Sequence, residues 1–283
     1  MNGNISGVGS VERPARRLLL AAALLLIVTG VLLHASGMDV PWMLRVHEQA
    51  PQALSVVLWS SITVLGLGSA ASILVLASDR GQGRIAALLL PILLLGGLMT
   101  HLPKWWFAVP RPAGSQVASQ LHVIGHAFSG AVSMPSGHSV TAGAAAVLLC
   151  IAFGLRPLAS AAAVLGGMLV AWSRVAVGAH WPSDVFVGFG LGFMTAVLIL
   201  WAGSWPRVRQ AYDALVHRIQ TKGGQFAVAA VEVAAAVALL TEHTGYPAAR
   251  PMVLLIATVA AASALLRCHF AVATAGRATV GPT

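Results

Sequence analysis

The sequence predicts an all-α protein, a polytopic bundle of membrane-spanning helices. Of its 283 residues, 58% are hydrophobic and 9% are charged, and the mean hydropathy is +0.83. Soluble proteins contain about 45–50% apolar residues. Apolar runs of about 20 residues, enough to cross a bilayer as a helix, recur along the chain. A bilayer offers no water to hydrogen-bond the backbone, so its polar groups must pair within helices. We therefore expect helices throughout, with their apolar surfaces facing lipid.

Eight apolar runs follow one another along the chain. Six are strongly apolar and cover residues 17–35, 53–77, 85–103, 138–155, 157–176 and 183–203. The last two are weaker, because the run 224–241 contains Glu232 and the run 251–267 is short. We therefore expect four parts: a cytoplasmic N-terminal tail at residues 1–16, a six-helix core at 17–203, a basic cytoplasmic segment at 204–223, and a transmembrane hairpin with its tail at 224–283.

The distribution of cationic residues predicts the orientation. If the N-terminus lies inside, 12 of the 17 Lys and Arg residues fall in inner segments, as the positive-inside rule requires. The net charge of +9 is then a topology signal, and no nucleic-acid partner is expected. The basic N-terminus with the first apolar run resembles a signal peptide, but the run is longer than a typical one. We therefore expect an uncleaved first span.

The first candidate motif follows the third apolar run. Lys104 is followed seven residues later by Arg111, which lies between Pro110 and Pro112. Two cations at one helix end can neutralise the oxygens of a phosphate. Both can equally be interfacial cations whose long side chains reach the lipid headgroups. This motif alone leaves both interpretations open.

The second candidate motif is Pro135-Ser136-Gly137-His138, directly before an apolar run. Ser136 can cap a helix N-terminus, and Gly137 lets the backbone approach a ligand closely. The N–H groups of a first helical turn attract anions. An ordinary helix cap with an incidental histidine would have the same sequence, so both interpretations again stay open.

The third candidate motif joins two adjacent apolar runs. Arg174 ends the first run, and Pro182 suits the first turn of the second. His180 then lies just before a helix N-terminus, with Asp184 about one turn inside it. A carboxylate there can hold one imidazole nitrogen and leave the other free to attack an electrophile. Simple capping of the helix by His180 and Asp184 is the alternative.

The predicted orientation places all three motifs on the outer face of the membrane. Together they supply three cations, two histidines and a carboxylate, which can hold a phosphate, attack it and protonate the leaving group. The sequence contains no carboxylate cluster suited to magnesium, and Cys150 and Cys268 have no metal-ligand spacing. We therefore expect a phosphoryl-transfer site with no metal and no other cofactor.

With these motifs the chain resembles the type 2 phosphatidic acid phosphatase superfamily. The family pattern, K-x6-R-P, then P-S-G-H, then S-R-x5-H-x3-D, is matched in full, and the resemblance covers roughly residues 15–203. The resemblance implies that His180 is a nucleophile forming a phosphohistidine, that Asp184 orients it, and that His138 protonates the leaving oxygen. It also implies a phosphate-binding set composed of Lys104, Arg111, Ser136, Gly137 and Arg174.

The resemblance implies an integral membrane phosphatase that hydrolyses lipid phosphate or diphosphate monoesters at the periplasmic face of a bacterial inner membrane. Candidate substrates are undecaprenyl diphosphate, phosphatidylglycerol phosphate, phosphatidic acid and the phosphates of lipid A. Transfer of the phosphoryl group to another lipid is the main alternative. A vanadium-dependent haloperoxidase is disfavoured because those relatives are soluble. A non-enzymatic lipid transporter is disfavoured because the spans carry almost no charge.

The hairpin at residues 224–283 goes beyond the six-helix pattern that the resemblance implies. Glu232 is an ionisable group at membrane depth, and we favour a packing or oligomer contact for it over a second ligand site. A homo-oligomer formed through the hairpin is therefore one interpretation. The segment 113–134 is placed to act as a substrate-selecting loop, although its His122 and His126 fit ordinary surface histidines better than ligands.

Overall fold

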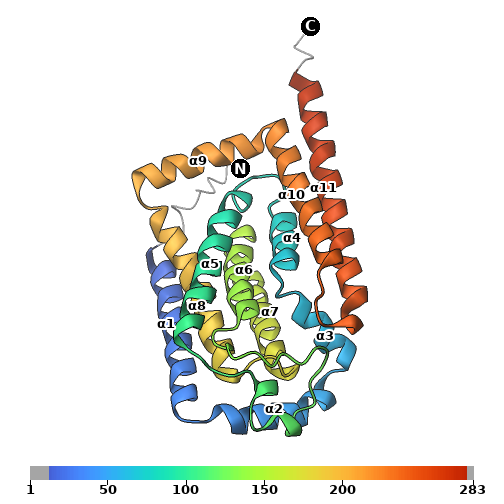
Figure 1. Cartoon of the computed structure of the whole chain (residues 1–283). Coiled ribbons are helices and arrows are strands. Elements are labelled where there is room, and N and C mark those ends of the chain that lie inside the picture. The colour runs from blue at the N-terminus through green and yellow to red at the C-terminus, as the bar shows by residue number, and fades with distance from the viewer. Residues whose placement is uncertain (1–12, 279–283) are drawn as a thin grey trace.

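The computed structural model describes residues 13–278 as an all-helical bundle (Figure 1). Most of the predicted tail at 1–16, and residues 279–283, lie outside the described part. The helices are α1 (Arg13–Ala35), α2 (Asp39–Ala53), α3 (Val56–Val64), α4 (Gly68–Ser78), α5 (Ala86–Trp106), α6 (Gly137–Ala152), α7 (Pro157–Ala176), α8 (Pro182–Ala202), α9 (Pro206–Gln220), α10 (Lys222–Thr241) and α11 (Arg250–Ala278). Short 3-10 turns occur at Pro112–Gly114, Ala118–Gln120 and Pro247–Ala249.

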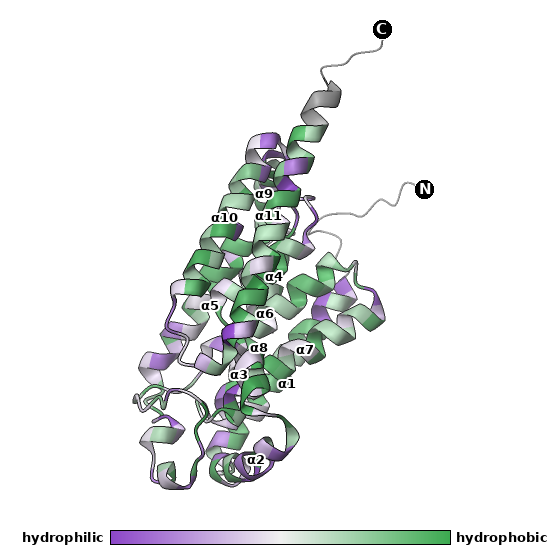
Figure 2. Cartoon of the chain, turned by 90° about the vertical axis from the view of Figure 1, so that its right-hand side faces the viewer, coloured by the Kyte–Doolittle hydropathy of each residue, from purple (hydrophilic) through white to green (hydrophobic). Residues whose placement is uncertain are grey.

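The described helices confirm the predicted fold class. Within residues 13–278, six helices are long and apolar enough to cross a membrane, namely α1, α5, α7, α8, α10 and α11. The pair α3 and α4 makes a seventh span if it is counted as one, and α6 is apolar but shorter, with 16 residues. Hydrophobic residues run along the middle of the bundle, while hydrophilic residues gather mostly toward its two ends (Figure 2). The chain is therefore a multi-pass helical membrane protein.

The apolar run predicted at residues 53–77 forms a broken span rather than one straight helix. Helix α3 ends at Val64, α4 begins at Gly68, and the two axes differ by 70°. Glycine weakens a helix interior, and a Cβ on Gly66 would lie 3.0 Å from side-chain atoms of His138. The break thus lets the backbone pass closely beside a residue of the second motif.

Helix α8 is the most buried of the candidate spans and organises the core. A Cβ on Gly192 would lie 2.3 Å from the carbonyl oxygen of Val140 in α6, and one on Gly190 would lie 2.8 Å from that of Ala23 in α1. Helices in lipid associate largely through such close packing at small residues, because lipid tails are as apolar as the side chains. The middle of α8 is therefore packed closely against α6 on one side and α1 on another.

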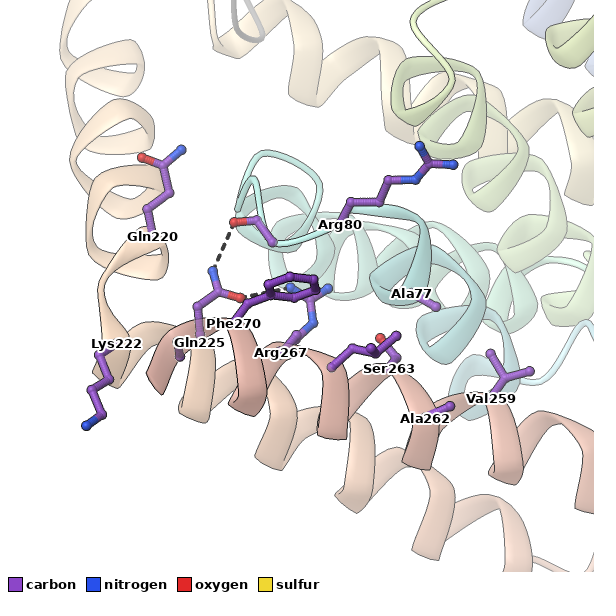
Figure 3. A pocket seen from close by; sticks show the side chains of 13 residues that line it. Ala77, Arg80, Gln220, Lys222, Gln225, Val259, Ala262, Ser263, Arg267 and Phe270 are labelled. Atoms are coloured by element: carbon purple, nitrogen blue, oxygen red, sulfur yellow. Dashed lines mark hydrogen bonds between the residues drawn. The ribbon is translucent and has the colours of Figure 1, made fainter. Parts of the chain in front are cut away.

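The hairpin of α10 and α11 packs against α4 through a buried ionic cluster. Arg267 lies 3.1 Å from the Glu232 carboxylate and 3.8 Å from that of Asp79, and its side chain is only 4% exposed. Ser263 donates a 2.6 Å hydrogen bond to Glu232. Gln225 accepts one from Arg267 at 3.2 Å (Figure 3). Glu232 therefore pairs within the chain. These contacts connect the hairpin to the end of α4.

Helices α2 and α9 lie across opposite ends of the bundle (Figure 1). Helix α9 has no buried residue, and its Tyr212 hydroxyl donates a 3.1 Å hydrogen bond to the carbonyl of Arg84. Helix α2 lies at the other end, where the segments that carry the three motifs also meet. Its Asp39 accepts hydrogen bonds from both the backbone and the hydroxyl of Ser183, at 2.9 and 2.6 Å.

Candidate active site

The three motifs meet at one end of the bundle (Figure 1). They occupy the last turn of α5 with the loop after it, the N-terminus of α6, and the connection between α7 and α8. The Ser136 N–H donates a 3.1 Å hydrogen bond to the Asp184 carbonyl, which joins the second motif to the third. A Cβ on Gly188 would lie 2.6 Å from the Ser136 carbonyl oxygen, so only glycine permits this approach of α6 to α8.

His180 and Asp184 form a buried pair. Their Nδ1 and Oδ2 atoms lie 3.1 Å apart, and the side chains are 3% and 0% exposed. The same Oδ2 accepts a 2.9 Å hydrogen bond from the Trp181 N–H and another from the Ser133 hydroxyl. Asp184 therefore caps α8 and contacts the imidazole at once, while its role in orienting a nucleophile stays a prediction. The carboxylate favours a proton on Nδ1, which leaves the lone pair on Nε2.

Arg111 faces the other nitrogen of the imidazole. Its Nη1 lies 3.2 Å from His180 Nε2 and donates a 3.0 Å hydrogen bond to the Ala179 carbonyl. Its guanidinium also lies over the Phe128 ring, 5.4 Å from the centroid. Trp181 Nε1 donates a 2.7 Å hydrogen bond to the carbonyl of Pro110, which fixes the loop that carries Arg111. A cation is thus held beside the atom that would attack phosphorus.

Burial lowers the pKa of His180 well below the ordinary histidine value of 6.5, and the nearby charges of Arg111, Arg174 and Lys104 lower it further. The imidazole is therefore neutral at neutral pH, as a nucleophile requires. We expect an NMR titration of ¹⁵N-labelled histidine, with His180→Asn to identify the signal, to give a protonation midpoint below 6.5. A midpoint at or above 6.5 would contradict a nucleophile kept neutral by burial and neighbouring cations.

Arg174 is the most deeply buried cation of the set, with 2% of its surface exposed. Its Nη1 donates hydrogen bonds to the Thr63 hydroxyl at 2.8 Å and to the Tyr246 hydroxyl at 2.9 Å. Its Nε is buried and has no hydrogen-bond partner in the described protein. A buried, unpaired donor is rare, and a ligand oxygen is the natural acceptor for it.

The second motif supplies a helix N-terminus and a histidine. Ser136 is fully buried, and its hydroxyl accepts a 3.4 Å hydrogen bond from the Ser139 N–H, so it caps α6 as the sequence suggests. Gly137 and His138 occupy the first turn, where N–H groups have no partner inside the helix. His138 interacts electrostatically with His180 and with all three cations, which places it in the same cluster.

Lys104 is the least engaged member of the predicted set. It lies in the last turn of α5 with its side chain partly exposed, and it forms no hydrogen bond or ion pair with the other described residues. It interacts electrostatically with Arg111 and Asp184. Helix α5 thus places Lys104 at the edge of the cluster, beside Trp105 and Trp106, which are 86% and 85% exposed.

Four residues of this region were not predicted from sequence. Ser133 contacts both members of the buried pair, since its hydroxyl also lies 3.3 Å from His180 Nδ1. Asp39 holds the N-terminus of α8, while Thr63 and Tyr246 hold Arg174. Of these four residues, only Ser133 could have been suggested by the sequence, because it lies two residues before the second motif.

Within the described residues, this cluster has no set of metal ligands, and a cavity of about 690 Å³ lies away from it. Among residues 13–278, no group of three or more His, Cys, Asp or Glu side chains is placed to hold a metal ion. A cavity of about 690 Å³ lies beside Arg267 at the opposite end of the bundle, and none of the motif residues lines it (Figure 3).

Comparisons with known proteins show what the part of the chain with the three motifs is similar to. Residues 85–207, which contain all three motifs, match the family model of the PAP2 superfamily. This part of the chain is therefore similar to the PAP2 superfamily. A lipid A 1-phosphatase of Porphyromonas gingivalis is 33% identical over 109 residues, which cover 38% of this chain and 21% of that relative. No solved structure matches the chain significantly.

Proposed function

We propose that the protein hydrolyses phosphate or diphosphate monoesters of membrane lipids, through a phosphohistidine, at the periplasmic face of a bacterial inner membrane. One observation carries this proposal. The buried His180 has its Nδ1 against Asp184 and its Nε2 beside Arg111, while Arg174 keeps a buried N–H without a partner. A neutral nucleophile beside unsatisfied donors for an oxyanion is the arrangement that phosphoryl transfer to histidine needs.

The reaction follows in two balanced steps. His180 Nε2 attacks phosphorus while the bond from phosphorus to the ester oxygen breaks, and His138 gives its proton to the leaving oxygen. Water then attacks the phosphohistidine, His138 takes a proton from it, and the bond from phosphorus to Nε2 breaks to release inorganic phosphate. Lys104, Arg111, Arg174 and the first-turn N–H groups of α6 offset the charge on the phosphoryl oxygens. The cations perform this role without a metal.

A cavity of about 260 Å³ supports a lipid as the substrate. It lies between α4, α5 and α6 and begins at Gly66, Gly137 and His138. Most of its lining is apolar or small, including Val75, Leu89, Ile92, Leu93, Gly96, Gly97, Ala144, Ala145 and Leu148. Because His138 would protonate the leaving oxygen, a hydrocarbon chain attached to that oxygen can lie in this cavity while the phosphate lies among the cations.

Filling this cavity should discriminate between lipid and water-soluble substrates. A Cβ on Gly97 meets no atom within 4 Å, so Gly97→Leu places its side chain in the cavity without a backbone clash. We expect kcat/KM for a long-chain lipid phosphate to fall about tenfold, since one well-packed chain contact is worth ~1–3 kcal/mol. Hydrolysis of a water-soluble aryl phosphate should change less than about twofold, since this substrate has no long chain to make hydrophobic contacts in the cavity.

The matched control for this experiment is Gly166→Leu. Gly166 lies on α7, has equal space around it, and does not line the cavity. We expect this variant to behave as the wild type on both substrates. Equal losses on the lipid and the aryl phosphate in Gly97→Leu, or no loss on either, would show that the chain of the substrate lies elsewhere.

The proposed function is tested by phosphate release from the purified protein in detergent with EDTA present. The substrate panel comprises phosphatidic acid, phosphatidylglycerol phosphate, undecaprenyl diphosphate and lipid A. Lipid A is included because the relative from Porphyromonas gingivalis is named for that activity. We expect metal-independent release of inorganic phosphate from at least one of them. Phosphorylation of a second lipid without free phosphate would instead establish phosphoryl transfer, and a strict requirement for magnesium would contradict the metal-free mechanism.

A further inference from the structure

Tyr246 reaches the site from a part of the chain that the family match does not include. It lies in the connection between α10 and α11, beyond residues 85–207. Its side chain is buried, with 3% exposed, and its hydroxyl oxygen lies 2.9 Å from Arg174 Nη1. The Arg174 guanidinium also lies 5.5 Å from the centre of the Tyr246 ring. The connection lies beside α3 at the end of the bundle where the motifs meet (Figure 1).

The contact determines how Arg174 can meet a phosphate. Thr63 and Tyr246 both accept from Nη1, and Nε is buried without a partner. Nε and Nη2 form one edge of the planar guanidinium, and this edge can donate two parallel hydrogen bonds to an oxyanion. Holding Nη1 therefore orients the free edge before a ligand arrives. Pre-orientation of this kind lowers the cost of ordering the side chain on binding.

The backbone next to Tyr246 is hydrogen-bonded to the loop between α5 and α6, which also carries Arg111 of the first motif. The His126 N–H donates a 2.8 Å hydrogen bond to the carbonyl of Gly245. Gly125 and Gly245 both have positive φ, at 78° and 79°, and a Cβ on Gly125 would lie 2.4 Å from the Gly245 carbonyl oxygen. The same loop places Phe128 against Arg111. The hairpin connection is thus packed against a loop that contacts a second cation of the site.

We infer that Tyr246 is a positioning residue that holds Arg174 for phosphate, so that the hairpin of α10 and α11 forms part of the phosphate site. This inference rests on the proposed function for the role of Arg174. Ligand binding alone can test it, even if the protein turns over none of the lipids offered.

The test is Tyr246→Phe, which removes the hydroxyl and keeps the ring. We expect the affinity for inorganic phosphate, measured from the concentration dependence of thermal stabilisation, to fall about tenfold, the size of one hydrogen bond to a charged group. The value of kcat/KM should fall by a similar factor. The control is Tyr212→Phe, which removes the only other tyrosine hydroxyl of the chain, bonded to Arg84 at the opposite end. It should leave phosphate affinity unchanged.

A double-mutant cycle separates positioning from general packing. Lysine has no Nη1 for the hydroxyl to hold, so Tyr246→Phe should change phosphate affinity less than about twofold when it is added to Arg174→Lys. An equal tenfold loss in both backgrounds would overturn the inference, and so would an unchanged affinity in Tyr246→Phe alone. Wild-type protein that binds phosphate but hydrolyses no lipid would contradict the proposed function and leave this cycle interpretable.

Discussion

His180→Ala is expected to lower kcat by at least about 10³-fold on every substrate, because it removes the atom that, in the proposed mechanism, forms the bond to phosphorus. Removing the nucleophile of a serine protease costs on the order of 10⁶-fold in kcat. His180 is 2% exposed and contacts Arg111, Ser133 and Asp184. Rates should be measured together with thermal unfolding in detergent, so that loss of fold is distinguished from loss of chemistry.

The informative control for His180→Ala is another buried histidine. His47 in α2 is 5% exposed, and its Nε2 lies 3.2 Å from the Val175 carbonyl, close to the site in space but with no contact to the candidate nucleophile. His47→Ala should keep most of its activity at a temperature where the variant is folded. Appreciable turnover by folded His180→Ala would remove the assignment of His180 as nucleophile.

Asp184→Asn should have the second largest effect. The carboxylate accepts hydrogen bonds from Ser133, Trp181 and His180. An amide keeps the shape of this side chain but can donate to Nδ1, which moves the imidazole proton to Nε2 and blocks attack. The equivalent exchange in a serine protease triad lowers kcat about 10⁴-fold, and we expect a loss of about 10²- to 10⁴-fold here.

Asp39→Asn is the matched control for the change at Asp184. Asp39 is also a buried carboxylate at the N-terminus of α8, but it binds Ser183 and His34 rather than His180. We expect Asp39→Asn to lower thermal stability more than kcat. Similar losses of kcat in the two variants would show that both carboxylates act by stabilising the N-terminus of α8. Orientation of His180 by Asp184 would then not explain the loss of activity in Asp184→Asn.

The sequence was informative where local rules decide the structure. Ser136 caps α6 and Pro182 opens α8, because serine accepts from first-turn N–H groups and proline has no N–H to lose there. These rules placed the motifs at helix ends, and the structure brings the ends together.

What the sequence could not predict depends on contacts between distant segments. Thr63 and Tyr246 meet Arg174 across 111 and 72 residues of chain, and no local pattern specifies such a meeting. The hydropathy pattern could not predict the break between α3 and α4, because a bend in the chain does not change the polarity of its residues. Gly66 and Gly68 lie at the break. The sequence identified Glu232 as an ionisable residue within an apolar run. It could not identify the partner, Arg267, which lies 35 residues away on another helix.

The most direct test of the central claim is to trap the covalent intermediate. His138→Ala protein can be mixed with an activated, ³²P-labelled aryl phosphate, whose leaving group needs no general acid, and then quenched in base. Without a base to activate water, the phosphoenzyme should accumulate. We predict base-stable, acid-labile label on the peptide that contains His180 and none in His180→Ala/His138→Ala. Release of phosphate with no label on His180, or label on another residue, would contradict a phosphohistidine mechanism.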